Sequence, residues 1–146
     1  MKAIEIICKA EGCKLAAYRC QAGVWTLGWG HVGKDVVPGL IWTQAQADRA
    51  FVADVLGFAD GVAKLCDRKL TANQHGALTS FAFNLGMGNL KTSTLLKYHR
   101  VGRYKQAAAE FGKWNKARDA SGKLGPLTGL TIRRAAESAL YMEPDA

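Results

Sequence analysis

The sequence predicts a mainly helical α+β fold with two lobes, a long helix that joins them and a cleft between them. Three observations support this fold class. Extended, turn-rich sequence is confined to residues 17–33, a long helical pattern follows over residues 43–66, and most of the remaining chain carries apolar residues at helical spacing. We expect one domain over 146 residues, with a small α+β lobe (1–42), the connecting helix and a helical lobe (67–146).

The small lobe is expected to begin with a helix over residues 2–11, which Gly12 ends. Residues 17–33 then indicate a β-hairpin with Gln21-Ala22-Gly23 as its turn. A third strand is expected near Val36-Val37. The apolar residues that place the first helix are Ile4, Ile7 and Cys8.

The connecting helix is expected to begin after Thr43, a favourable N-cap, and Gly57 and Gly61 are expected to weaken or bend it. Thr71 is a second expected N-cap. The later helices are expected over residues 71–84, 93–100, 104–116 and 131–141, with a loop over 119–126.

Charge and cysteine content narrow the function classes. The chain has 20 Lys and Arg against 12 Asp and Glu, so its net charge of +8 favours polyanionic partners such as nucleic acid, an anionic membrane or a bacterial cell wall. Its four cysteines have no zinc-ligand spacing, so we expect no metal and no cofactor, and free thiols of a reducing compartment. We find no secretory signal and no membrane-spanning run.

The stretch TLGWGHVG contains a G-x-G-x-x-G pattern at Gly28, Gly30 and Gly33. A dinucleotide site needs a helix that opens on the last glycine. Here the following run ends in Pro38-Gly39, which is a turn signal. The pattern therefore does not indicate a nucleotide site, and the glycines need another explanation.

Glu11 continues the apolar stripe of the first helix, at i+4 from Ile7. It also lies at the helix C-terminus, where the helix dipole disfavours negative charge. Burial and the dipole both favour the neutral carboxyl, and a neutral carboxyl can act as a general acid. The alternative is a terminal glutamate that points into solvent.

Cys20 and Thr26 flank the hairpin turn. If the loop has three residues, Tyr18 pairs with Thr26, and Cys20 and Thr26 lie diagonally on one face of the ribbon. A thiol and a hydroxyl on one face could hold a water molecule. The alternative is a buried cysteine and an ordinary strand threonine.

The stretch EGCKLAAYRCQAGVWTLGWGH (residues 11–31) resembles the phage-type lysozymes, the endolysins of glycoside hydrolase family 24. Their signature is Glu, eight residues, Asp or Cys, five residues, Thr, and Glu11, Cys20 and Thr26 fit every spacing. The stretches FNLGMGNLKTSTLL (83–96) and GLTIRRAAESALY (129–141) also resemble the family. The resemblance implies a two-lobed lysozyme fold and cleavage of the β-1,4 bond between N-acetylmuramic acid and N-acetylglucosamine in peptidoglycan.

The resemblance also implies catalytic roles. Glu11 would protonate the glycosidic oxygen, while Cys20 and Thr26 would prepare a water molecule on the opposite sugar face, as an inverting enzyme requires. Cysteine replaces the aspartate of many members here, and a thiol with a pKa of about 8.5 is a weak base at neutral pH. Cys20 could therefore act as a base, or only position water or stabilise the developing charge.

Four further residues receive implied supporting roles. Gly30 would lie near the substrate at the floor of the cleft, and Asn84 would face the cleft, with a helix C-cap as its alternative. His31 would be structural and pair with an acidic group, and Arg133 would approach Glu11 from the helical lobe. Its neighbour Arg134 is expected on a solvated face.

Partners and location follow from the same resemblance. We expect a monomer that acts on peptidoglycan, binds no nucleic acid and does not insert stably into a membrane. Without the signal anchor of related endolysins, the protein is expected in the host cytoplasm until a holin releases it to the wall. A disulfide from Cys8 or Cys13 to Cys20 is a hypothesis for blocking the site in an oxidising compartment.

Two other functions stay open. A lytic transglycosylase needs only one acid/base group, because the hydroxyl of the sugar replaces water. A catalytically inactive basic module would bind wall polymers or nucleic acid through its charge alone.

Overall fold

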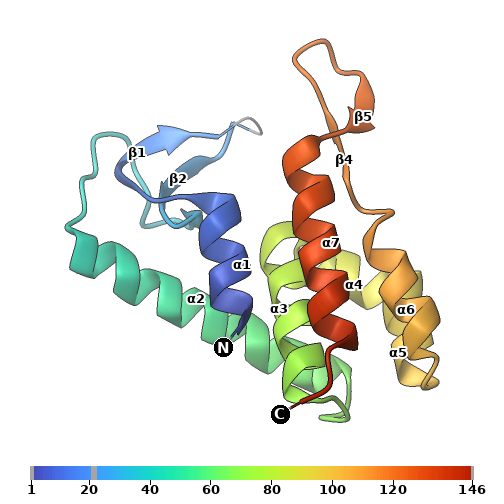
Figure 1. Cartoon of the computed structure of the whole chain (residues 1–146). Helices are drawn as coiled ribbons and strands as arrows, with labels where there is room; N and C mark the ends of the chain where they lie inside the picture. The colour runs from blue at the N-terminus through green and yellow to red at the C-terminus, as the bar shows by residue number, and fades with distance from the viewer. Residues whose placement is uncertain (1, 21–22, 146) are drawn as a thin grey trace.

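The computed structural model describes residues 2–20 and 23–145, and residues 21–22 of the predicted hairpin turn lie outside them. The small lobe begins with helix α1 (Lys2–Glu11) and continues into a three-stranded antiparallel sheet (Figure 1). Its strands lie in the order β1-β2-β3 and span Lys14–Arg19, Trp25–Gly28 and His31–Val32.

The predicted register of the hairpin is confirmed. Tyr18 pairs with Thr26, and the amide of Cys20 donates to the carbonyl of Val24 at 3.0 Å. The third strand was expected near Val36-Val37 but occupies His31–Val32, so that prediction is wrong. The chain reverses at Gly30, which has a φ of +86°, and pairing resumes immediately afterwards, when Thr26 meets Val32.

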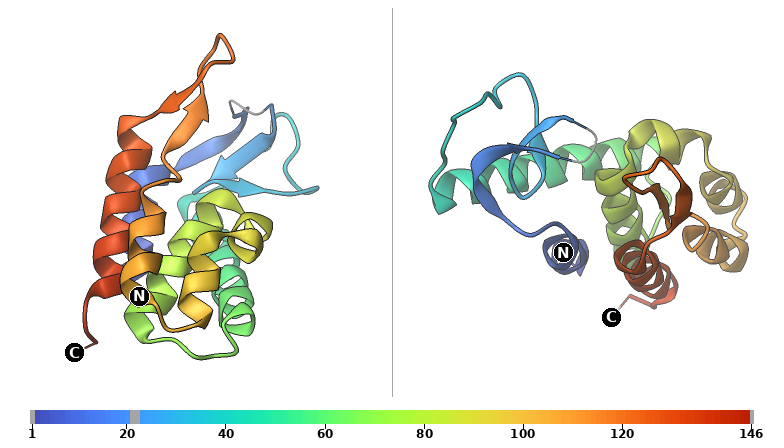
Figure 2. Two further views of the ribbon diagram at one scale, coloured as in Figure 1. Left: turned by 90° about the vertical axis from the view of Figure 1, so that its right-hand side faces the viewer. Right: turned by 90° about the horizontal axis from the view of Figure 1, so that it is seen from above.

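Helix α2 (Gln44–Leu65) connects the lobes over 22 residues. Seen from above, it runs from under the sheet to the helical lobe (Figure 2). Thr43 caps it as predicted, because its hydroxyl accepts from the amide of Gln46 and the side chain of Gln46 accepts from the amide of Thr43. Gly57 and Gly61 lie within the continuous helix and do not interrupt it. Its buried face supports the sheet at one end and the helical lobe at the other.

In the helical lobe, the other helices pack around α3 (Ala72–Leu85), which Thr71 caps as predicted. The remaining helices are α4 (Met87–Thr92), α5 (Thr94–Arg100), α6 (Tyr104–Phe111) and α7 (Thr128–Met142). Helix α6 ends five residues before the predicted limit, and the predicted loop over 119–126 includes a strand. That strand, β5 (Leu124–Pro126), pairs with β4 (Lys116–Arg118) in a projecting hairpin (Figure 1).

The main apolar core lies between α3 and its surrounding helices, where Leu78, Phe81 and Phe111 are fully buried. A smaller cluster of Ile7, Phe51 and Val55 joins α1 to α2 below the sheet. Helix α1 therefore belongs to both lobes, and its last residue lies where they meet. Within the described residues, every helix is too short or too polar to cross a lipid bilayer.

Candidate active site

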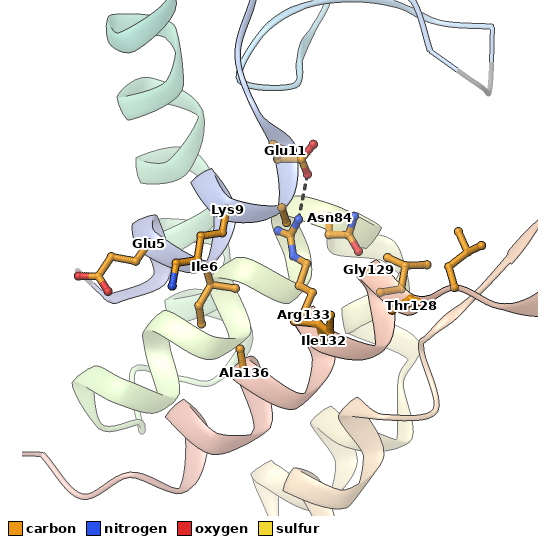
Figure 3. Close-up of a pocket in the computed structure, with 13 residues that line it drawn as sticks. Glu5, Ile6, Lys9, Glu11, Asn84, Thr128, Gly129, Ile132, Arg133 and Ala136 are labelled. Carbon is orange, nitrogen blue, oxygen red and sulfur yellow. Dashed lines mark hydrogen bonds and ion pairs between the residues drawn. The ribbon is translucent and has the colours of Figure 1, made fainter.

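Glu11 is the last residue of α1, and its carboxyl faces α7 across the junction of the lobes (Figure 3). Nη1 of Arg133 donates to Oε1 of Glu11 at 3.0 Å. The side chain of Glu11 keeps 25% of its surface exposed. This ion pair rules out a terminal glutamate that simply points into solvent, and it leaves the acid accessible.

A pocket of about 690 Å³ lies between α1 and α7, with Glu11, Asn84 and Arg133 among its lining residues. Figure 3 shows these three side chains close together at one end of the pocket. Asn84 lies in the last turn of α3, and its Oδ1 is buried without a hydrogen-bond partner among the described residues. Such an unpaired acceptor is costly unless a ligand donates to it.

Gly30 lies directly against the acid. A Cβ atom added there would come within 3.1 Å of Oε2 of Glu11, and the φ of +86° also disfavours any other residue. This placement explains one glycine of the G-x-G-x-x-G pattern. The backbone between β2 and β3 can approach the carboxyl closely only because no side chain intervenes.

Arg133 is held on its other edges by buried groups. Its Nε donates to Oε1 of Glu137 at 3.2 Å, and Nη2 donates to the carbonyl of Ser80 at 3.1 Å. Arg134 is fully buried, so the predicted solvated face is wrong. Its Nη2 donates to Glu137 at 2.8 Å, and its guanidinium lies over the ring of Phe81.

Glu137 is a residue that the sequence analysis missed. Its spacing at i+3 and i+4 from the two arginines was the available signal, because such residues are neighbours on a helix. That spacing usually marks an exposed ion pair. Only the packing of α3 on α7 makes this one fully buried.

Thr26 and Cys20 lie on the sheet side of Glu11. Thr26 is buried, and its hydroxyl donates to the carbonyl of Val24 at 3.0 Å. The confirmed register places Cys20 and Thr26 on one face of the β1–β2 ribbon. Tyr18, the partner of Thr26, also belongs to this region and was missed. Burial raises the pKa of Tyr18, and so do its electrostatic interactions with Glu11 and Cys20.

His31 has the structural contacts that were expected, and its acidic partners are now identified. Nδ1 lies 2.7 Å from Asp54 on α2, and Nε2 lies 3.0 Å from Asp35. Burial lowers the pKa of His31, but the hydrogen bonds to Asp54 and Asp35 outweigh it and raise the pKa overall. The imidazole therefore fastens the sheet to the connecting helix.

The four cysteines form no disulfide. The extended strand β1 separates Cys13 from Cys20 by roughly 20 Å, whereas a disulfide requires Cα atoms within about 7 Å. The hypothesis of a Cys13–Cys20 bond is therefore incompatible with this sheet. Across the described part of the chain, no cluster of three or more His, Cys, Asp or Glu side chains could hold a metal ion.

A sequence profile described as phage lysozyme matches residues 8–137 of the chain. The chain belongs to the phage lysozyme family. Among its curated relatives, the endolysin of Acyrthosiphon pisum secondary endosymbiont phage 1 is 45% identical over 143 residues, covering 96% of this chain and 94% of the relative. The endolysin of Bacillus phage PZA is 43% identical over 94% of this chain, which spans about half (52%) of that longer protein.

Solved structures of similar proteins share the fold. The muramidase domain of SpmX from Asticaccaulis excentricus has a TM-score of 0.87 and 32% identity, covering 98% of this chain and 96% of that one. The endolysin of Escherichia coli O157:H7 phage FAHEc1 has a TM-score of 0.84 and 33% identity over 97% and 91% of the two chains. The predicted lysozyme fold of this family member is thus confirmed.

Proposed function

We propose that this phage lysozyme is an endolysin that hydrolyses the β-1,4 bond from N-acetylmuramic acid to N-acetylglucosamine in the host wall, with Glu11 as its general acid. The observation that carries the proposal is the position of the Glu11 carboxyl and its contacts. The carboxyl lies at the junction of the lobes, held on one oxygen by Arg133 and open to a pocket. The net charge of +8 also suits an anionic wall polymer.

In the first half of the reaction, protonated Glu11 donates its proton to the glycosidic oxygen. The bond from C1 to that oxygen then breaks, and its electron pair stays with the departing sugar. Glu11 becomes a carboxylate beside Arg133, whose guanidinium stabilises the new negative charge at 3.0 Å. Gly30 lets the sugar chain approach the carboxyl because it carries no side chain.

In the second half, water attacks the positively charged C1 from the opposite face and inverts it. The Thr26 hydroxyl already donates to Val24, so its oxygen is available only to accept a hydrogen bond from that water. Cys20 lies on the same face and completes the water site. The water proton leaves to solvent after the attack, and Cys20 acts by positioning the water.

Substrate binding is assigned to Gly30 and Asn84. Oδ1 of Asn84 is buried with no hydrogen-bond partner in the described part of the chain, so a bound ligand should donate to it. The N-acetyl groups of both sugars carry an N–H that can do so. His31 supports the site from behind by fixing the sheet on α2.

A lytic transglycosylase is the second candidate, because cysteine stands at position 20 instead of a carboxylate. The test is to digest purified peptidoglycan with the parent and with Glu11→Gln, and to analyse the sugar ends by mass spectrometry. Reducing N-acetylmuramic acid ends from the parent alone would support hydrolysis by Glu11. Anhydro ends would identify a transglycosylase, and no cleavage by the parent would refute both enzymes.

A further inference from the structure

We propose that Glu137 is a positioning residue for the general acid: through Arg133 it fixes the place of the Glu11 carboxyl, and it supplies a negative charge behind that arginine. The inference rests on the proposed function, because it assigns a task to a residue behind the acid. Glu137 itself lies in α7, fully buried and out of contact with the pocket.

The contacts of Arg133 leave it a single orientation. Nη1 donates to Glu11, Nε to Glu137 and Nη2 to the backbone carbonyl of Ser80, so each nitrogen of the guanidinium has a different partner. Only 3% of the Arg133 side chain is exposed. A planar guanidinium that is fixed along two edges directs its third edge at Glu11 without free rotation.

Glu137 is in turn fixed from three sides. Its Oε1 accepts from the Ser80 hydroxyl at 2.7 Å, from Arg133 at 3.2 Å and from Arg134 at 2.8 Å. Burial raises the pKa of Glu137 overall, and the two guanidinium groups and the Ser80 hydroxyl offset part of that effect. A carboxylate that accepts from two guanidinium groups is the form that this cluster stabilises.

The charges of the cluster bear directly on the acid. Arg133 and Arg134 contribute two positive charges, and Glu137 balances one of them. Protonated Glu11 therefore faces one net positive charge. Without the charge of Glu137, Glu11 would face two positive charges, and its protonated, neutral form would be less favoured. Tyr18 on β1 also interacts electrostatically with Glu11, and Lys9 and Glu5 of α1 line the same pocket.

The expected shift follows from distance. The Arg133 guanidinium bridges the two carboxylates, which places them roughly 8 Å apart. At an effective dielectric constant of about 20, a unit charge at that range corresponds to about 1.5 pH units. We expect Glu137→Gln to move the alkaline limb of the kcat/KM profile to lower pH by about that amount. Arg134→Met removes a positive charge and should move the same limb to higher pH.

The experiment measures the release of reducing sugar ends from soluble peptidoglycan fragments between pH 4 and 9. The parent, Glu137→Gln, Glu137→Asp, Arg134→Met and Glu110→Gln are compared. Glu110 is the matched control, because it is also a buried carboxylate. It lies on α6, away from the site, and it accepts a hydrogen bond from Lys113. Glu110→Gln should leave the pH profile unchanged.

Glu137→Asp separates charge from position. It keeps the negative charge but shortens the side chain, so the alkaline limb should stay in place while kcat falls about tenfold and KM changes less than twofold. If Glu137→Gln does not fold, Arg134→Met decides the question, because its alkaline limb should move to higher pH. A lower fraction of folded enzyme alone would reduce kcat without moving the pH profile.

Two results would overturn the proposal: a Glu137→Gln profile that coincides with those of the parent and Glu110→Gln, or a Glu137→Asp enzyme with the parent kcat. Failure of the proposed function looks different. In that case the parent releases no reducing ends, or Glu11→Gln retains activity, whatever residue stands at position 137.

Discussion

Replacing Gly30 by alanine should separate backbone strain from damage to the acid. The new Cβ would lie 3.1 Å from Oε2 of Glu11, closer than an ordinary contact, so the carboxyl must move by a few tenths of an ångström. The φ of +86° adds strain of about 1–2 kcal/mol for a residue with a Cβ. In a chain of this length, that loss lowers Tm by roughly 3–6 °C.

The catalytic effect should exceed what this strain alone causes. Displacement of a reacting group by about 1 Å can cost about 10²-fold in rate, so a smaller movement should lower kcat by roughly tenfold. Gly39→Ala is the matched control: it has a φ of +83° in the same lobe, but nothing lies within 4 Å of the added Cβ.

The assay combines thermal unfolding with steady-state cleavage of peptidoglycan fragments. Both variants should lose similar stability, and only Gly30→Ala should lose kcat at a temperature where each is folded. Equal kcat values for the two variants would refute the argument that Gly30 is needed for its contact with Glu11.

Three further outcomes are expected. Because the pKa of His31 is raised on folding, its contribution to stability is full below its unfolded pKa and is lost as pH rises through the folded pKa. In urea unfolding, His31→Asn should therefore lose the most stability relative to the parent near pH 5.5 and the least near pH 9. A loss of stability that is the same at both pH values would contradict this. Thr26→Val should lower kcat about 10²-fold with a loss of stability of about 1 kcal/mol. Cys20→Ser should keep kcat within about tenfold of the parent, because a hydroxyl can also hold the water. If Cys20 were a true base, its loss would cost about 10²–10⁴-fold in kcat. Burial raises the pKa of Cys66 to about 11, so its thiol should not react with iodoacetamide at pH 7.5 until the protein unfolds. Mass spectrometry of the labelled protein checks this. Rapid labelling of Cys66 in the native protein would show that the thiol is not buried.

The parts of the site that depend on local sequence were predictable. The i+4 spacing from Ile7 placed Glu11 at the buried edge of α1, and a three-residue loop sufficed to pair Tyr18 with Thr26. The roles of Glu11, Cys20 and Thr26 in catalysis stay predictions, since geometry places them but does not test their chemistry.

The errors occur where tertiary packing outweighs local preference. Val36-Val37 has strand-forming side chains, yet Val36 turns into the core and Val37 faces solvent beside the Pro38-Gly39 turn. Arg134 was expected on a solvated face, and arginine is in general seldom fully buried. Its burial depends on Glu137 and Phe81, and the approach of α3 to α7 that brings Phe81 there cannot be read from either helix alone.

The ion pair from Glu11 to Arg133 also has a consequence in time. The two residues are 122 positions apart, so a ribosome that adds about 5–20 residues each second needs roughly 6–24 s to progress from one to the other. During that interval the glutamate has already been synthesised, but the arginine that orients it does not yet exist. The site is thus complete only in the nearly finished polypeptide. In a nascent chain stalled before α7, Glu11 would lack the arginine that orients it.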